Sequence, residues 1–129
     1  MDRIALPASP RTPLVDFDFA LGTLVMRGES YPEDAAGFFG PLHKALADYL
    51  KGRGEAAVTV EMEMAYFNSS SAKALMNMFQ LLETAARSGT PVTIQWRFAE
   101  GDETMQEFGE EFAADFEHAT FELCPHAAS

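Results

Sequence analysis

The sequence predicts an α/β fold in which a mixed five-stranded sheet carries its helices mainly on one face. Hydrophobic and polar residues alternate in residues 58–67 and 92–98, a period of two that is typical of strands with one buried face. Residues 72–87 carry hydrophobic side chains at helical spacing instead. The predicted order is strand-strand-helix-strand-helix-strand-helix-strand. Strands joined through helices are therefore expected to pair in parallel, by right-handed crossovers.

The first third of the chain is expected to form an arm, a hairpin and a helix. Residues 1–12 contain prolines and little periodicity, so we expect a loose terminus. Residues 15–19 and 23–27 predict the two strands of a hairpin. A helix should follow, with Ser30 as a candidate cap. Pro41 lies inside the helical pattern and should kink this helix or split it in two.

The centre of the chain is predicted to be a strand, a polar corner and a long helix. The strand residues expected to face the core are Val58, Val60, Met62, Met64 and Tyr66. The corner Asn68-Ser69-Ser70-Ser71 follows, and the helix covers residues 72–87. Backbone N–H groups lack partners where a helix begins, and the helix dipole favours negative charge there. The corner is therefore a favourable place for an added anion.

The last third is predicted to add a strand, a helix and a short closing strand. Residues 92–98 form the strand, and residues 103–116 form the helix, with Met105, Phe108, Phe112 and Phe116 on one face. Residues 120–124 should close the sheet, and residues 125–129 should be a loose tail. A chain of 129 residues is expected to be a single domain, here residues 1–129.

Composition and charge restrict the classes of partner. The net charge is −11, with nine basic and twenty acidic residues, which argues against nucleic acid and against anionic membrane. The single cysteine, Cys124, suits a reducing compartment. No basic start precedes an apolar run, and no stretch approaches the ~20 apolar residues that span a bilayer. We therefore expect a soluble cytoplasmic protein.

Two interpretations of the serine corner remain open, and both can hold together. Serine and asparagine are common before helices because their side chains cap backbone N–H groups. One cap needs only one such residue, however, and Lys73 lies near enough to contact an added phosphate. The second interpretation is that one hydroxyl is a phosphoacceptor whose charge switches a docking surface. In the combined form Ser70 or Ser71 caps the helix and Ser69 is modified.

The helix after the corner carries a second apolar stripe, made of Ala74, Met78, Leu81 and Ala85. One interpretation is a central helix that neighbours cover on both sides. The other is an exposed patch beside the corner, in which Met78 and Leu81 bind a partner.

No residue pattern nominates an enzyme, a cofactor or a metal site. The acidic pairs Asp16/Asp18 and Glu61/Glu63 each project onto one strand face, where paired carboxylates can bind metal or act as acid and base. The competing interpretation is a solvated sheet face. The histidines lack metal-ligand spacing; they are His43, His118 and His126. The motifs of serine hydrolases, phosphate loops and dinucleotide-binding folds are absent from the sequence.

Three segments carry a family resemblance. They are Gly28-Glu29-Ser30-Tyr31-Pro32-Glu33, Tyr66-Phe67-Asn68-Ser69-Ser70-Ser71-Ala72-Lys73-Ala74, and Gly89-Thr90-Pro91-Val92 leading to Trp96. Their content and spacing resemble the SiaC-type family of bacterial regulatory phosphoproteins, over about residues 12–124. That family is similar in fold to the STAS domains of anti-sigma-factor antagonists, so a STAS-like fold is expected. Pro41 departs from the uninterrupted first helix expected of relatives.

The resemblance implies a non-enzymatic partner switch. A kinase of the histidine-kinase-like type would phosphorylate the corner, and a PP2C-type phosphatase would remove the phosphate. The unmodified protein would bind and activate a diguanylate cyclase, which links the switch to c-di-GMP signalling and biofilm formation. By position the phosphoacceptor falls on Ser69, where relatives frequently have threonine. Asn68, Ser70, Ser71 and Lys73 would shape its surroundings.

Two rival functions remain. One is a binding module of the anti-sigma-factor-antagonist type without a cyclase partner. The other is a small enzyme that uses the sheet-face carboxylates Asp16, Glu61 and Glu63, and it requires a deep pocket that gathers them.

Overall fold

Six strands form one mixed sheet in the computed structural model, which describes residues 3–52 and 54–127. The strands, in their order across the sheet, are β1 Ile4–Leu6, β2 Leu14–Asp18, β3 Thr23–Ser30, β4 Val58–Phe67, β5 Val92–Ala99 and β6 Thr120–His126. The pairs β1–β2 and β2–β3 are antiparallel, whereas β3–β4, β4–β5 and β5–β6 are parallel. The predicted hairpin and parallel crossovers are confirmed, but the predicted count of five strands is wrong.

The additional strand lies in the segment that was expected to be a loose N-terminal arm. Ile4 pairs with Phe17 across β1 and β2. The guanidinium of Arg3 donates two hydrogen bonds to the carboxylate of Asp16, at 2.8 and 2.7 Å. A three-residue edge strand has no alternation long enough to predict it, so its pairing partner decides its structure.

The C-terminal end is also more ordered than the predicted tail. β6 continues through Pro125 to His126, which pair with Phe98 and Ala99 of β5. Because β6 is an edge strand, the N–H that proline lacks can fall on the side without a neighbour. Within the described residues, the expectation of a loose end from residue 125 is therefore wrong; residues 1–2 and 128–129 lie outside the described part of the chain.

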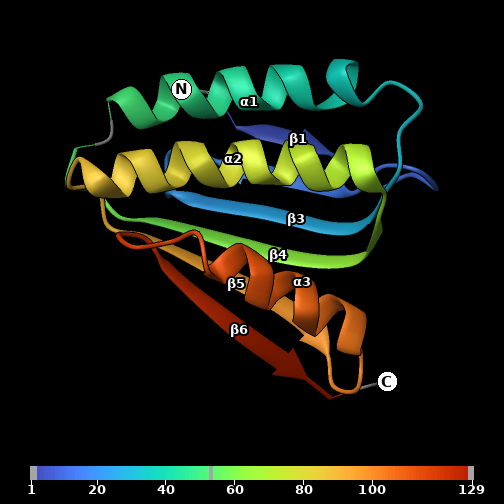
Figure 1. Cartoon of the computed structure of the whole chain (residues 1–129). Coiled ribbons are helices and arrows are strands. Elements are labelled where there is room, and N and C mark those ends of the chain that lie inside the picture. The colour runs from blue at the N-terminus through green and yellow to red at the C-terminus, as the bar shows by residue number, and fades with distance from the viewer. Residues whose placement is uncertain (1–2, 53, 128–129) are drawn as a thin grey trace.

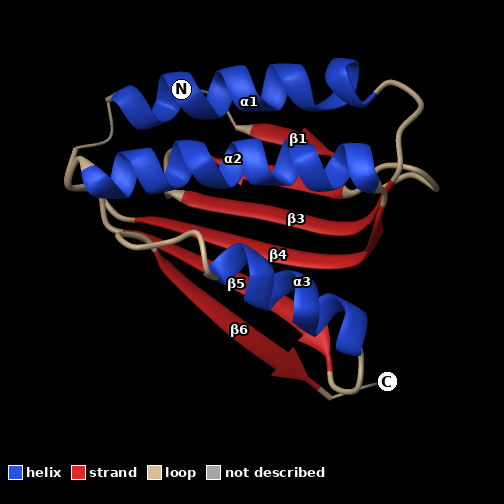
Figure 2. Cartoon of the chain, in the orientation of Figure 1, coloured by secondary structure: helices blue, strands red, loops and turns tan. Residues whose placement is uncertain are grey.

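Three helices cover the same face of the sheet (Figures 1 and 2). They are α1 Ala35–Lys51, α2 Ser69–Arg87 and α3 Glu103–Ala113. α1 and α2 lie side by side, and α3 lies over β5 and β6 (Figure 1). The prediction of helices on one face is confirmed. Within the described ranges, none of these helices is long and apolar enough to cross a bilayer.

The core lies between the sheet and this helical layer. Alternate strand residues are buried there, among them Val15, Phe17, Leu24, Met26, Val60, Met62, Ile94 and Trp96. The intervening side chains are only half-buried, and they form the open face of the sheet. The Trp96 indole Nε1–H donates to the Met105 carbonyl at 2.9 Å, which joins α3 to β5.

A β-bulge reverses the alternation at the end of β4. Gly28 pairs with Met64 but Glu29 pairs with Tyr66, so Ala65 is an extra residue. One extra residue turns the following side chains to the opposite faces. Tyr66, predicted to be buried, is therefore 49% exposed, and Phe67 is buried in its place.

The first helix begins and continues differently from the prediction. Its cap is Asp34, whose carboxylate accepts from the Gly37 N–H at 3.0 Å, and not Ser30. Pro41 lies inside α1, which is not split. Proline has no N–H, so the Gly37 carbonyl, four residues earlier, lacks its usual helical partner. Pro41 and Gly37 are both exposed, so this carbonyl lies on the solvent side.

Candidate functional site

The serine corner is a helix start capped by asparagine. Asn68 has an extended backbone, and its side-chain oxygen accepts from the Ser71 N–H at 2.9 Å. Its carbonyl accepts from the Ala72 N–H at 2.9 Å. The cap is therefore Asn68, and the expectation that Ser70 or Ser71 caps the helix is wrong. α2 begins at Ser69, earlier than the expected residue 72.

Ser71 is a structural residue. Its side chain is fully buried, and its hydroxyl donates to the Ser30 carbonyl at 2.9 Å while sharing a 2.8 Å hydrogen bond with the Ser30 hydroxyl. Ser30 ends β3 and is equally buried, and its carbonyl also accepts from the Asn68 N–H at 3.1 Å. These bonds join the end of β3 to the start of α2. A kinase cannot reach the Ser71 hydroxyl without opening this junction.

Ser69 and Ser70 are both exposed at the first turn of α2. Ser69 also lines a surface pocket of about 240 Å³, which sets it apart from Ser70. The other lining residues are Tyr66, Phe67, Asn68, Ala72 and Phe108. An added phosphate on Ser69 would thus lie beside aromatic side chains and near the positive end of the helix dipole.

The remaining residues around the corner are placed as follows. Lys73 is exposed one turn after Ser69, on the same side of α2, where an ammonium group is within reach of a phosphate. Tyr66 packs edge-on against Tyr31, with ring centroids 5.8 Å apart. The bulge in β4 therefore brings Tyr66 to the surface beside the serines, against the half-buried Tyr31, and the strand pattern alone concealed this.

The expected partner patch on α2 is mostly core. Met78 is only 1% exposed, and Ala74 and Ala85 are buried as well. Leu81 is half-buried and lines surface pockets with residues such as His43 and Thr84. The second stripe is thus mostly covered, as the interpretation of a central helix expects, but the side of α2 toward α3 stays open, and the burial of Met78 excludes its direct contact with a partner. The exposed methionine of α2 is Met76, at 42%.

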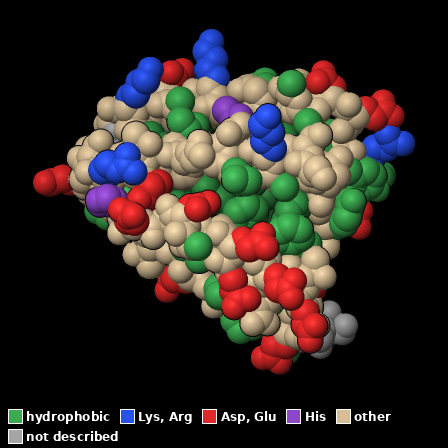
Figure 3. Space-filling model, viewed as in Figure 1, with side chains coloured by type: hydrophobic (Ala, Val, Ile, Leu, Met, Phe, Trp, Pro, Cys, Tyr) green, Lys and Arg blue, Asp and Glu red, His purple; other side chains and the backbone are tan. Residues whose placement is uncertain are grey.

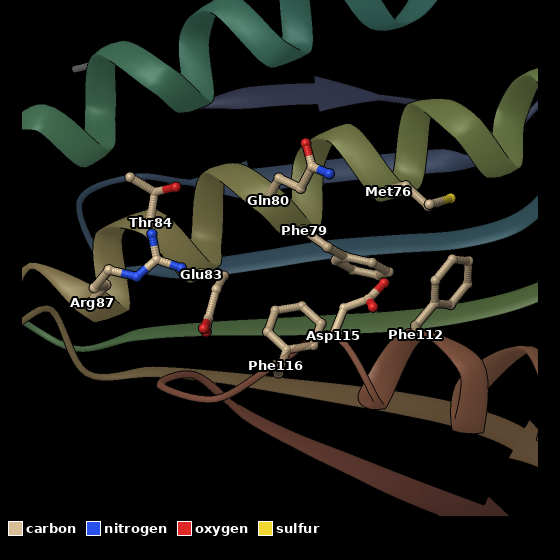
Figure 4. A pocket seen from close by; sticks show the side chains of 9 residues that line it. All are labelled: Met76, Phe79, Gln80, Glu83, Thr84, Arg87, Phe112, Asp115 and Phe116. Atoms are coloured by element: carbon tan, nitrogen blue, oxygen red, sulfur yellow. The ribbon is translucent and has the colours of Figure 1, made fainter.

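A larger pocket of about 430 Å³ lies between α2 and the end of α3. Figure 4 shows the side chains that line it: Met76, Phe79, Gln80, Glu83, Thr84 and Arg87 of α2, with Phe112, Asp115 and Phe116 from α3 and its following turn. Phe79 stands edge-on to Phe112 and Phe116, with centroids 5.1 and 5.8 Å away. The floor is thus aromatic, and carboxylates lie at its edge.

Glu83 is the residue of this region that sequence reasoning missed. It is 7% exposed, and its carboxylate accepts from the backbone N–H groups of Glu117, His118 and Ala119 at 2.9–3.2 Å. The His118 ring Nδ1 lies 3.1 Å from the same carboxylate. Burial acts to raise the pKa of Glu83, but the hydrogen bonds outweigh it and lower the pKa to about 2.

The sheet-face carboxylates lie beside basic side chains on an open surface. Glu61 lies 2.8 Å from Arg97, Asp16 is held by Arg3, and Glu63 lies 3.7 Å from His126. The guanidinium of Arg3 lowers the pKa of Asp16 through its hydrogen bonds. Among the residues that the structure describes, no three His, Cys, Asp or Glu side chains gather as metal ligands would. This arrangement matches the solvated sheet face.

Comparison with known proteins gives consistent matches along almost the full length. The family described as "SiaC family regulatory phosphoprotein" matches residues 6–126. An uncharacterized protein of Pseudomonas aeruginosa strain UCBPP-PA14 is 33% identical over 115 residues, which cover 89% of this chain and 90% of that protein.

Solved structures from Pseudomonas aeruginosa are similar as well. One is apo-SiaC, at 31% identity and a TM-score of 0.83, with 98% of this chain and 100% of that chain covered. Another comes from the crystal structure of diguanylate cyclase SiaD in complex with its activator SiaC. It has 32% identity, a TM-score of 0.89 and coverage of 95% and 99%. The family is regulatory, in agreement with the non-enzymatic role expected from the sequence. On the length of its family match and this likeness in sequence and fold, the chain belongs to the SiaC family of regulatory phosphoproteins.

Proposed function

We propose that this protein is a partner switch in which phosphorylation of Ser69 controls binding to a diguanylate cyclase. The unmodified form binds and activates the cyclase, and the phosphorylated form does not. A histidine-kinase-like Ser/Thr kinase adds the phosphate, and a PP2C-type phosphatase removes it. The switch would then act in c-di-GMP signalling and biofilm formation.

The observation that carries the proposal is the difference among the corner serines. Ser71 is fully buried and hydrogen-bonded to Ser30, whereas Ser69 is exposed and lines a pocket. Asn68 already provides the helix cap, so the Ser69 hydroxyl is not needed for it. The relative SiaC, found in complex with the cyclase SiaD, supports the class of effector.

The physical effect of the phosphate follows from its surroundings. It adds a charge of about −1.5 to −2 at neutral pH. The pocket at Ser69 is lined by Tyr66, Phe67 and Phe108, and a partner that covers it would strip water from the phosphate. Only Lys73, one turn away, offers a nearby cation on α2. The unmodified hydroxyl carries no comparable desolvation cost, so the partner binds that form.

The test is binding of the cyclase from the native host to Ser69→Asp and Ser69→Ala variants. Ser69→Asp should weaken binding at least about tenfold, or ~1.4 kcal/mol, and Ser69→Ala should retain it even after kinase treatment. Calorimetric titration measures both affinities. Intact mass and phosphosite mapping of protein from its own host should place one phosphate on Ser69.

Matched serine variants serve as controls. Ser70→Ala should still accept the phosphate, because the acceptor is the preceding residue. Equal cyclase binding by Ser69→Asp, Ser69→Ala and kinase-treated wild type would contradict the proposed phosphorylation switch. Capture of an anti-sigma kinase with no cyclase would instead favour a binding module of the anti-sigma-factor-antagonist type.

A further inference from the structure

The backbone along one edge of β6 points to solvent. β6 is the last strand of the sheet that residues 3–52 and 54–127 form, and it pairs only with β5. The His126 carbonyl accepts from the N–H of Glu100, which directly follows β5, at 2.8 Å. The two backbone groups of a strand residue point to the same side, and this side alternates from one residue to the next. Since the groups of His126 point toward β5, those of Phe121, Leu123 and Pro125 point outward.

These outward groups can pair with a further strand. Phe121 and Leu123 each present an N–H and a carbonyl, whereas Pro125 presents only a carbonyl. An extended chain that lies along such an edge forms main-chain hydrogen bonds with it and extends the sheet. The same strand would cover Leu123, whose side chain is 38% exposed. With seven residues against the three of β1, β6 is the longer of the two sheet edges.

Carboxylates border this edge on both faces of the sheet. On the helical face, Gly109 is buried against the sheet and Phe108 lines the pocket beside α2. Helical spacing turns Glu103 and Glu110 away from Phe108, to the flank of α3 that faces the outer edge of β6. On the open face, Glu122 is exposed on β6 itself.

Basic side chains do little to balance these carboxylates. Residues 102–127 contain no lysine or arginine but eight acidic residues, Asp102, Glu103, Glu107, Glu110, Glu111, Asp115, Glu117 and Glu122. Figure 3 shows acidic side chains gathered over α3. On the neighbouring strand, the Arg97 guanidinium lies 2.8 Å from Glu61, which offsets its charge. His118 and His126 each lie beside a glutamate as well. The surroundings of the edge are therefore negative.

The charge around the edge decides between possible occupants. A second copy of this chain would bring the same carboxylates and a net charge of −11, so it would be repelled. A segment with lysines or arginines would be attracted instead. Side chains of paired strands lie next to each other on each face of a sheet. A basic residue of the added strand would thus lie beside Glu122, and an adjacent apolar residue would lie beside Leu123.

We infer that the outer edge of β6 binds a basic, extended segment of a partner protein, which pairs with it as an additional strand. The segment alternates lysine or arginine on the open face with apolar residues on the helical face. The edge is separate from the serine corner, because α3 lies between α2 and this side of β6 (Figure 1). The inference goes beyond the proposed function and does not depend on it.

The first test asks whether the edge is open in the free protein. Amide hydrogen exchange, followed by NMR, should be at least tenfold faster for Phe121 and Leu123 than for Glu122 and Cys124. The latter two have backbone groups on the β5 side of the strand. Equal protection of all four amides would show that the edge is already covered and would overturn the inference.

The second test uses a synthetic peptide as the probe. It has nine residues that alternate valine and lysine, with both termini blocked. Titration should shift the NMR amide signals of Phe121 and Leu123 and slow their exchange several-fold. The same sequence with N-methylated backbone amides should bind at least tenfold more weakly, because it cannot donate to the edge. A peptide with glutamate in place of lysine should also bind at least tenfold more weakly. Equal binding by the N-methylated peptide, or no shift at these two amides, contradicts strand pairing.

The third test reverses one charge at the edge. Glu122→Lys should weaken binding of the valine–lysine peptide at least fivefold at low salt. Asp48→Lys on α1 is the matched control, since it makes the same change of charge at an exposed site far along the chain. It should change the affinity less than twofold. Circular dichroism confirms that both variants fold. Equal losses in the two variants would mean that the peptide responds to net charge and not to this edge.

The results separate this inference from the proposed function. The peptide titration does not involve Ser69, so equal cyclase binding by the Ser69 variants would leave the edge site standing. A failed titration would leave the proposed switch standing. Self-association of the free chain, with protected amides at Phe121 and Leu123, would overturn the basic segment in favour of a second copy.

Discussion

At the scale of the residue, three neighbouring serines with the same side chain have different environments. Ser71 points into the junction with Ser30, and Ser69 and Ser70 face solvent. Helical spacing turns each serine by about 100° from the last, so only one of the three faces the core. The bulge at Ala65 acts at the same scale, because it brings Tyr66 to the surface beside Ser69.

Ser71→Ala should destabilise the fold by about 1–2 kcal/mol, because the buried Ser30 hydroxyl loses its acceptor and the Ser30 carbonyl keeps only the Asn68 N–H as a donor. Urea unfolding measures the change. Ser70→Ala, next to it and exposed, should remain within about 0.5 kcal/mol of wild type. Equal stability of the two variants would show that the Ser30–Ser71 junction does not hold the corner together.

At the scale of the element, the close approach of α3 to the sheet depends on a glycine. A Cβ on Gly109 would lie 2.5 Å from Trp96 Cδ1 and 2.6 Å from Leu123 Cδ2. The Trp96 ring cannot easily shift, because it is buried and its Nε1–H bonds to Met105. α3 therefore rests on β5 and β6 at a position where only glycine fits.

Gly109→Ala should lower stability by about 1–2 kcal/mol, since overpacking outweighs the gain of about 1 kcal/mol in helix propensity. Gly52→Ala is the control, because an added Cβ there meets no atom within 4 Å. Thermal unfolding compares the two. If Gly109→Ala raises the melting temperature, helix propensity dominates and the contact with Trp96 is loose.

At the scale of the whole molecule, one buried carboxylate joins the two halves of the helical layer. The carboxylate of Glu83 on α2 accepts hydrogen bonds from the backbone N–H groups of residues 117–119. These residues directly follow Phe116 and lead from α3 to β6. The turn just before them, with Asp115 and Phe116, lines the pocket between α2 and the end of α3. The charge of Glu83 therefore links the stability of the fold to pH.

The contribution of Glu83 should disappear in acid. Its folded pKa, about 2, lies below its ordinary value of 4.5, so its stabilisation is complete above about pH 5 and is lost as the pH falls toward 2. Glu83→Gln should be about 2 kcal/mol less stable at pH 7, and the difference should narrow by pH 3. Urea unfolding across this pH range checks both.

His118→Ala is the control for Glu83. It removes one partly exposed contact and keeps the three backbone donors, so the loss should stay below about 1 kcal/mol. A gap between wild type and Glu83→Gln that is constant from pH 7 to pH 3 would show that the carboxylate does not titrate as described.

The periodicity of hydrophobic residues was sufficient to predict most of the strands and helices. The alternation of Val58, Val60 and Met62 and the helical stripe after Asn68 predicted a strand, a corner and a helix, because each pattern extends over several repeats. The edge strand Ile4–Leu6 and the end of β6 were missed because short edge strands depend on a neighbour. The STAS likeness stays a prediction.

The sequence alone determined the helical layer on one face, the polar corner at the start of α2 and the family, because these follow from local patterns. Only the tertiary structure decided which corner serine is reachable, that Met78 is core while Met76 is exposed, and that Glu83 meets three N–H groups more than thirty residues away. Burial and long-range hydrogen bonds depend on which elements become neighbours, and no local repeat encodes that information.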